Sequence, residues 1–337
     1  MDIERIPDRF GICRHSKKPS EEAVHPQPSE PYGAAHCLLT PTTPSRTRCV
    51  TRFAACLLLS MLAAASVSAN QLPERSSLRV VGSTTVQPVM EAVAARIAEP
   101  LGVAAAIRGG GSNVAVSAVC DGTADVGMVS RARAVEECRD AAWTTIGYDG
   151  VAVIVHQSNP VRTLSRDEIR SLYTGQTRRW TLSGFDHPVV LVSKAPERGT
   201  LAVFEDYSGL VSPARDGAAR AGAGANAGLI APTAWESGAN LESILWVAGS
   251  VGGIGFVSLA DARGAMEAGM PIRVVDVDWV APTIATIADG TYALVRPLIL
   301  VHRTGNARAQ AFVMMTRSDA AKEIIREAGF VPAEAAP

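Results

Sequence analysis

Three segments of the chain each combine an apolar run, a turn of small residues that carries Ser or Thr, and a helical pattern. The turns are residues 82–85, 109–112 and 198–200. The start of a helix exposes backbone N–H groups and the positive end of the helix dipole, so it favours an anion. Glycine lets a ligand approach the backbone, and hydroxyl groups add donors without adding charge. Together the three turns predict a site that surrounds a small oxyanion.

Two other interpretations of these turns compete with anion binding. Each Ser or Thr could cap its helix, which contributes about 1 kcal/mol to stability and binds nothing. A hydrolase would need a nucleophile beside a base or a metal centre; Ser112 and Ser130 are available, but the sequence has no G-x-S-x-G motif and no metal-ligand spacing. We therefore predict a binding protein, not an enzyme, with no metal and no cofactor.

Strand-like and helix-like segments alternate along the chain, which predicts an α/β architecture. Apolar positions 86, 89, 90, 93 and 97 follow the period of an amphipathic helix that ends at Pro100. The expected strands are 78–81, 126–129, 151–155, 189–192, 253–257 and 298–301. The expected helices are 86–97, 113–120, 165–173, 200–207, 241–247 and 307–328.

Composition and charge describe an ordinary globular protein. The chain has 337 residues, of which 47% are hydrophobic and 19% charged, with a formal net charge of −1. Nothing in this balance favours nucleic acid or an anionic membrane surface as a partner. An anion site in such a chain must create its positive potential locally.

The N-terminal region predicts export. Arg46, Arg48 and Arg52 precede the apolar run 53–65 and the small residues that end at Ala69. This order is typical of a secretory signal peptide, assigned to 50–69, and the run is too short to span a membrane. Residues 1–49 show no periodicity and are either a disordered prefix or a sign that the true start lies later. We expect a periplasmic protein.

Cleavage after Ala69 would leave two cysteines, Cys120 and Cys138. An even pair in an exported protein permits a disulfide, and closing this loop would stabilise the fold by about 3 kcal/mol. Two unpaired cysteines remain the alternative.

Read with their neighbours, the turns resemble the phosphate-binding protein family, the periplasmic substrate-binding components of phosphate ABC transporters. The resemblance runs from about residue 80 to residue 332. Its markers, in order, are segments 82–88, 109–112, 124–131, 149–155, 198–200, 254–257, 296–298 and 329–332.

The resemblance implies a two-lobed type II periplasmic-binding-protein fold with the ligand cleft between the lobes. Residues 76–154 and 300–334 would form the first lobe and 155–299 the second, with strands crossing at 153–156 and 298–302. It also implies inorganic phosphate as ligand, inner-membrane ABC permease subunits as partner and a monomer. The binding residues that carry over are Ser83, Thr84, Ser112, Gly199 and Thr200.

The chain departs from the family pattern in the third loop and in the third turn. Some members have an Asp in the third loop that accepts a hydrogen bond from protonated phosphate, whereas here Ser130 and Arg131 follow one another. Lys194 stands where an Arg is common, and Arg198 where Ser is frequent. Arg131 and Arg198 are therefore candidates for charge-assisted contacts.

The carboxylate acceptor is the part of the site that the sequence leaves open. Asp149 or Glu197 could supply it, and we name Asp149 as the possible acceptor. Without an assured acceptor, another tetrahedral oxyanion such as sulfate or molybdate remains an alternative ligand. A phosphate sensor and a phosphatase-like enzyme remain alternative functions.

Overall fold

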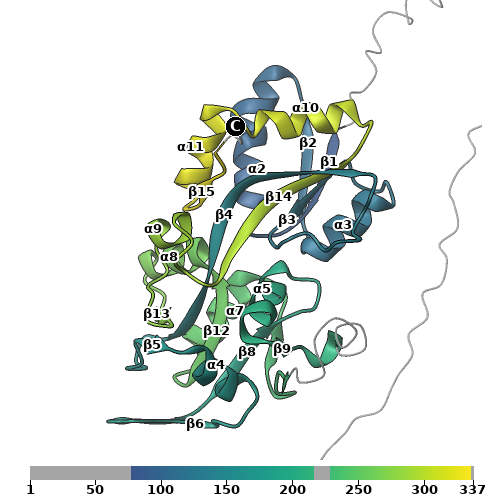
Figure 1. Ribbon diagram of the computed structural model, residues 1–337. Coiled ribbons are helices and arrows are strands. Elements are labelled where there is room, and N and C mark those ends of the chain that lie inside the picture. The colour runs from purple at the N-terminus through teal and green to yellow at the C-terminus, as the bar shows by residue number, and fades with distance from the viewer. Residues whose placement is uncertain (1–76, 216–227, 335–337) are drawn as a thin grey trace, which may run out of the picture. The chain divides into compact units, whose positions relative to one another are not determined.

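The computed structural model describes residues 77–215 and 228–334, which belong to one compact unit, Gln71–Pro337 (Figure 1). The predicted prefix, 1–49, and the predicted signal peptide, 50–69, lie outside the described residues. Among the described helices, none has both the length and the apolar character needed to cross a bilayer.

The first lobe is built on a sheet whose central strands are parallel. Strand β1 pairs in parallel with β2 on one side and with β3 on the other, and β14 lies antiparallel beyond β3. The inner strand β3 is fully buried and β14 largely so, whereas the edge strand β2 is half-buried or exposed. The elements are β1 (Leu78–Gly82), α2 (Gln87–Val93), β2 (Ala105–Gly109), α3 (Ser112–Cys120), β3 (Val126–Val129), α10 (Ala307–Met315), α11 (Asp319–Glu327) and β15 (Val331–Pro332).

The second lobe continues the same sheet in the order β11-β8-β12-β4, with β13 on the other side of β4. Its longer strands are β8 (Val190–Lys194), β11 (Trp235–Ser237), β12 (Gly253–Ser258) and β13 (Ile272–Val277). Its helices are α4 (Arg166–Tyr173), α5 (Gly199–Ser208), α7 (Asn240–Ala248), α8 (Leu259–Glu267) and α9 (Ile284–Ala288). Short strands complete it: β5 (Thr163–Leu164), β6 (Arg179–Leu182), β7 (Phe185–Pro188), β9 (Leu210–Val211) and β10 (Gly228–Leu229).

Two strands run through both lobes. The 16-residue strand β4 (Ala141–His156) pairs with β14 (Val295–Arg303) along its first part and with β12 and β13 along its last part. Figure 1 shows these two strands as long ribbons that pass from the first-lobe sheet to the second-lobe elements. The crossings predicted at 153–156 and 298–302 fall on β4 and β14.

An aromatic cluster fixes the second-lobe elements that lead to the cleft. Phe204 of α5 stacks on Phe256 of β12 with ring centroids 4.0 Å apart, and Tyr173 of α4 lies against both rings. The buried Tyr173 hydroxyl donates to the carbonyl of Val192 in β8 at 3.1 Å. Because α5 and β8 are held together in this way, the residues at their ends are also held close together.

Two predicted helices differ from the structure. The segment predicted as one helix over 307–328 is two helices, because the Ser318 hydroxyl accepts from the backbone N–H of Ala321 and starts α11. The helix predicted over 86–97 is α2 continued by a π-helical turn, Ala94–Ala98, and a 3₁₀ turn, Glu99–Leu101.

The structure joins Cys120, at the end of α3, to Cys138 in a disulfide with the Cα atoms 5.6 Å apart. The bridge ties α3 to the loop that follows β3 and so restrains the segment after Ser130.

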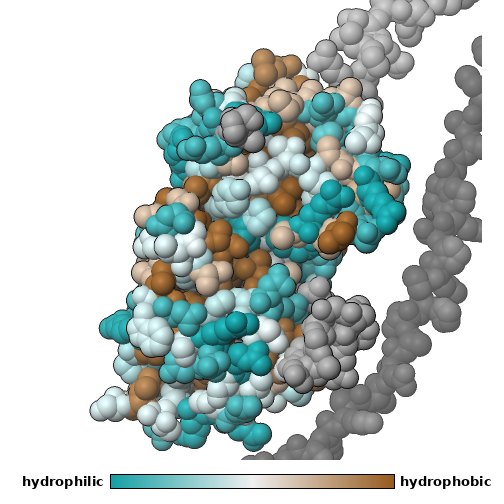
Figure 2. Space-filling model, in the orientation of Figure 1, coloured by the Kyte–Doolittle hydropathy of each residue, from teal (hydrophilic) through white to brown (hydrophobic). Residues whose placement is uncertain are grey.

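Over the face seen in Figure 2, hydrophilic and weakly polar residues cover most of the surface, with hydrophobic residues in separate spots.

Candidate functional site

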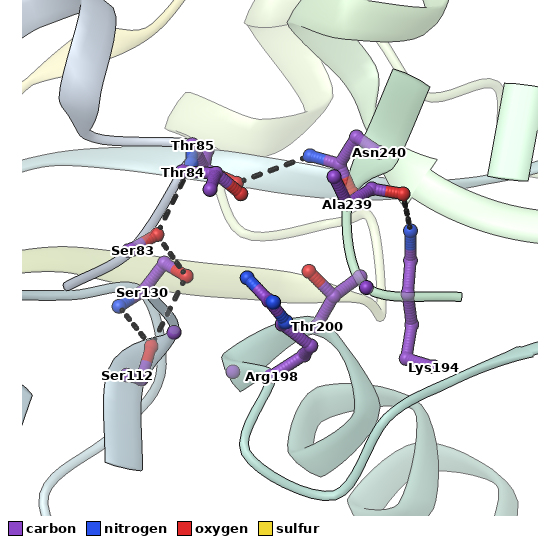
Figure 3. Close-up of a pocket in the computed structure, with 13 residues that line it drawn as sticks. Ser83, Thr84, Thr85, Ser112, Ser130, Lys194, Arg198, Thr200, Ala239 and Asn240 are labelled. Carbon is purple, nitrogen blue, oxygen red and sulfur yellow. Dashed lines mark hydrogen bonds between the residues drawn. The ribbon is translucent and has the colours of Figure 1, made fainter. Parts of the chain in front are cut away.

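The three turns singled out in the sequence line one pocket, joined there by a fourth turn that the sequence analysis did not assign to the site. Side chains from both lobes face one another across it (Figure 3). The lining residues are Ser83, Thr84, Thr85, Gly111, Ser112, Ser130, Lys194, Arg198, Gly199, Thr200, Gly238, Ala239 and Asn240.

Helices α3, α5 and α7 begin at this pocket, and none of them has a side-chain cap at its N-cap residue, Gly111, Arg198 and Ala239 respectively. Of the helices that begin elsewhere, α4, α9, α10 and α11 carry such a cap, whereas α8 does not. Gly111 has φ +111°, a conformation that other residues rarely adopt. In the first turns, the N–H of Asn113 donates to the carbonyl oxygen of Glu197 and that of Leu201 to the carbonyl oxygen of Arg198. The remaining first-turn N–H groups have no capping side chain and are available to an anion in the pocket.

A buried set of hydroxyl groups forms the first-lobe wall. The Ser83 hydroxyl donates to Ser130 Oγ at 2.8 Å, and the backbone N–H of Ser130 donates to Ser112 Oγ at 3.0 Å. These contacts are drawn in Figure 3. The three serines bond to one another and to backbone, and Ser130 Oγ also accepts from Arg296 Nη1 at 3.2 Å.

Arg296 of β14 lies behind the pocket and is fully buried. It donates to Asp149 Oδ2 through Nε at 3.0 Å and through Nη2 at 2.7 Å. Its Nη1 donates to Thr200 Oγ1 at 2.7 Å and its Nη2 to Thr85 Oγ1 at 3.0 Å. The guanidinium thereby links β4 and β14 to hydroxyls of both lobes, and those hydroxyls accept from it.

Lys194, at the end of β8, supplies a buried cation to the pocket lining with 1% of its surface exposed. Its ammonium donates to the carbonyl oxygen of Ala239 at 2.9 Å and to the Ser243 hydroxyl. Burial lowers the pKa of Lys194 to about 7, and the Arg296 charge adds to the decrease. This amine therefore gains or loses its charge near neutral pH.

Arg198 brings a second cation to the pocket lining, and its side chain points toward the centre of the site in Figure 3. Its buried Nε and Nη1 atoms have no hydrogen-bond partner among the described residues. Nε lies 3.2 Å from Glu197 Oε1, an ion pair without hydrogen-bond geometry. A buried donor without a partner is costly, so an anion in the pocket would satisfy it.

Gly199 marks a close approach of the two lobes at the site. A Cβ atom there would lie 2.4 Å from Ser112 Oγ and 2.9 Å from the Ser130 carbonyl oxygen. Nearby, the Asn113 side chain donates to the carbonyl oxygen of Pro196 at 3.1 Å. Glycine is thus the residue that lets α5 meet the wall of the first lobe.

Three of the residues considered in the sequence analysis do not line the pocket. Arg131 donates to Asn113 Oδ1 and forms an ion pair with Glu137, so its charge is directed to the loop after β3. Asp149 lies behind the pocket with Arg296; complete burial raises its pKa, and the guanidinium opposes the rise. Glu197 pairs with Arg198. The structure therefore does not bring either candidate carboxylate to the lining.

Arg296 and Asn240 are the main site residues that the sequence analysis missed. Arg296 stands in the apolar segment 295–301, where a charged residue needs a buried partner, and this pattern could have flagged it. Asn240 follows Ser237 and Gly238 at the start of a predicted helix, which repeats the small-residue turn of the other three segments. Within the described residues, no three His, Cys, Asp or Glu side chains gather as metal ligands would.

The PBP superfamily domain model matches residues 67–322. The chain belongs to this superfamily. The sequence predicted a two-lobed periplasmic-binding-protein fold, and this prediction is confirmed by the match and by similar solved structures.

Among the solved structures similar to this PBP-superfamily chain is a protein from Clostridium perfringens with bound phosphate, described as a phosphate ABC transporter substrate-binding protein. It is 26% identical, with TM-score 0.65, over 77% of this chain and 100% of the other. A phosphate transport receptor from Vibrio cholerae is 27% identical with TM-score 0.61, over 76% and 99%.

Curated relatives point the same way. Phosphate-binding protein PstS of Bacillus subtilis is 26% identical over 264 residues, 76% of this chain and 80% of the relative. Phosphate-binding protein PstS 2 of Streptococcus pneumoniae is 38% identical over 104 residues, which span only 36% of that relative's length. The resemblance to phosphate-binding proteins that the sequence predicted is confirmed.

Proposed function

We propose that this protein binds inorganic phosphate in the periplasm and delivers it to an ABC-type importer of the inner membrane. The observation that carries the proposal is the pocket on which three uncapped helix N-termini and the unpartnered donors of Arg198 converge. Such donors replace the hydration shell of a desolvated anion. The phosphate in the Clostridium perfringens structure and the names of the curated relatives support phosphate as that anion.

Transport by this route requires that the lobes open to admit the ligand and close on it. The contact of Gly199 with the Ser112 wall is a closed-lobe contact, and β4 and β14 are the strands about which the lobes would move. The predicted signal peptide supports a periplasmic location. Action as a monomer that delivers phosphate to permease subunits is part of the proposal.

Binding without catalysis is part of the proposal. The described lining holds no His, Asp or Glu that could act as a general base beside a serine. The same lack of a carboxylate makes another tetrahedral oxyanion, such as sulfate, the competing ligand. Selectivity must then come from neutral groups.

Calorimetric titration of the mature chain with phosphate, sulfate and molybdate tests the proposal. Ser112→Ala should weaken phosphate binding by about tenfold, the value of one hydrogen bond to a charged ligand. Ser117→Ala, an exposed position on the same helix, is the matched control and should leave binding unchanged. Absence of phosphate binding by the wild-type protein, or release of phosphate from an ester substrate that Ser112→Ala abolishes, would overturn it.

A further inference from the structure

The groups around the pocket are arranged almost entirely as donors. Thr85 and Thr200 each accept a hydrogen bond from Arg296 on the hydroxyl oxygen, which leaves their own protons free to point at a ligand. Arg198 and the helix N-termini can only donate, and so does Lys194 in its ammonium form. The carbonyl oxygen of Ala239 already accepts from Lys194. A ligand oxygen that carries a proton therefore finds few acceptors here.

Asn240 is the exception, because its carboxamide is held in one orientation. It is 6% exposed, and its Nδ2 donates to Asp261 Oδ2 at 2.5 Å and to Thr85 Oγ1 at 3.2 Å. An ionised carboxylate only accepts, so the amide nitrogen must face Asp261. The nitrogen's bond toward Thr85 is drawn in Figure 3.

In this orientation the carboxamide oxygen of Asn240 is the polar atom of the side chain that remains free to accept a hydrogen bond from a ligand. None of the described residues donates to Oδ1, and Asn240 is part of the pocket lining. Asn240 is also the first residue of α7, a nine-residue helix without a side-chain cap, so it stands at a helix start that favours the anion. An acceptor fixed among donors can recognise a proton on the ligand.

We propose that the Asn240 carboxamide oxygen accepts the hydrogen bond from the protonated oxygen of bound phosphate and makes the site prefer phosphate over sulfate. This inference rests on the proposed function and names its selectivity device. Phosphate keeps at least one proton at neutral pH, whereas sulfate has none. A sulfate oxygen would place a lone pair against Asn240 Oδ1, and both atoms would go unsatisfied.

A neutral acceptor suits this position better than either carboxylate considered from the sequence. Asp149 is committed to Arg296 behind the pocket, and Glu197 does not line it. A carboxamide oxygen accepts the hydrogen bond from the protonated phosphate oxygen, and it does not repel the phosphate dianion as a carboxylate would. The expected discrimination is that of one hydrogen bond gained against one lost, about tenfold to a hundredfold.

The test compares two variants against four anions by calorimetry. Phosphate and arsenate carry a proton at neutral pH, and sulfate and molybdate do not. Asn240→Ala should lower the affinity for phosphate and arsenate about tenfold more than the affinity for sulfate and molybdate. Thr200→Val is the matched control: it removes a donor that serves any of the four anions, so all affinities should fall by a similar factor.

The outcomes separate this inference from the proposed function. If Asn240→Ala weakens all four anions equally, Asn240 only holds the lobes together and the inference is wrong while phosphate binding stands. If the wild-type protein binds none of the anions, both the inference on Asn240 and the proposed function are wrong. Should Asn240→Ala fail to fold, Asp261→Asn serves instead: it frees the Asn240 amide to turn over, and the preference for phosphate over sulfate should drop. Unchanged selectivity in that variant overturns the inference.

Discussion

The titration of Lys194 should couple anion binding to proton uptake. Burial lowers the pKa of this amine to about 7, and Arg296 adds to the decrease. Arg198 acts in the same direction, whereas Asp261 and Glu242 oppose it. An anion in the pocket that Lys194 lines would favour the ammonium form and raise its pKa. The affinity for anions should therefore fall as pH rises above about 7.

The size of the effect follows from the charge separation. An anion about 4 Å from the ammonium, at an effective dielectric constant of about 20, contributes about 4 kcal/mol. That energy raises the pKa of Lys194 in the complex well above its ligand-free value, because the anion favours the ammonium form. Between about pH 6 and about pH 9 the association constant should then fall by about a hundredfold, close to tenfold per unit above the ligand-free pKa.

Sulfate is the probe for this experiment because its own charge does not change over the pH range. Its dissociation constant should be measured by calorimetry at several pH values and in buffers of different ionisation enthalpy, which report the proton taken up. Lys194→Arg should bind with little pH dependence, because a guanidinium stays charged. Lys194→Met should bind weakly at every pH. Lys322→Arg, on the distant helix α11, is the control and should keep the wild-type profile.

The ligand-free protein gives a second readout of opposite sign. Between about 7 and 10.5 the unfolded chain holds a proton on Lys194 that the folded chain has lost. The free energy of unfolding should therefore rise with pH in this window, while anion affinity falls. A sulfate affinity that stays flat in the wild-type protein, or a pH slope that survives in Lys194→Met, would refute the reasoning.

Three further changes have defined outcomes. Arg296→Met leaves the buried Asp149 carboxylate without its partner and should lower the free energy of unfolding by about 3–5 kcal/mol, measured by denaturant titration. Gly199→Ala should weaken phosphate binding by at least about tenfold in calorimetry, because its Cβ would meet Ser112 Oγ and keep the lobes apart. Reducing the disulfide should lower stability by about 3 kcal/mol, seen as a lower melting temperature.

Each of these changes has a matched control. Gly264→Ala adds a methyl group where no atom lies within 4 Å and should leave phosphate affinity as it is. Replacing Arg296 and Asp149 together by apolar residues should restore much of the stability that Arg296→Met loses, because no unpaired charge is then buried. An equal loss in the double variant would contradict the account of the pair. A melting temperature that stays the same when reductant is added would contradict the stabilising role of the disulfide.

The local elements and the binding turns could be predicted from the sequence because their signals are local. The small-residue turns at Ser83, Ser112 and Thr200 each follow an apolar strand and start a helix, so spacing alone indicated where N–H groups would be exposed. The alternation of strands and helices indicated an α/β fold. Arg198, adjacent to the third turn, was a candidate because it departs from the family pattern, and it lines the pocket.

The partners of the charged groups were decided by tertiary structure alone. The sequence made Arg131 and Arg198 equal candidates for a contact with the anion. In the structure, Arg131 forms an ion pair with Glu137, whereas Arg198 lines the pocket. Asp149 was expected near the ligand and instead pairs with Arg296, 147 positions away. The sequence by itself determined which turns could present donors, because a helix start is set by neighbouring residues. Only the fold decided which charges and acceptors meet them, because burial and pairing depend on residues that are distant in the chain.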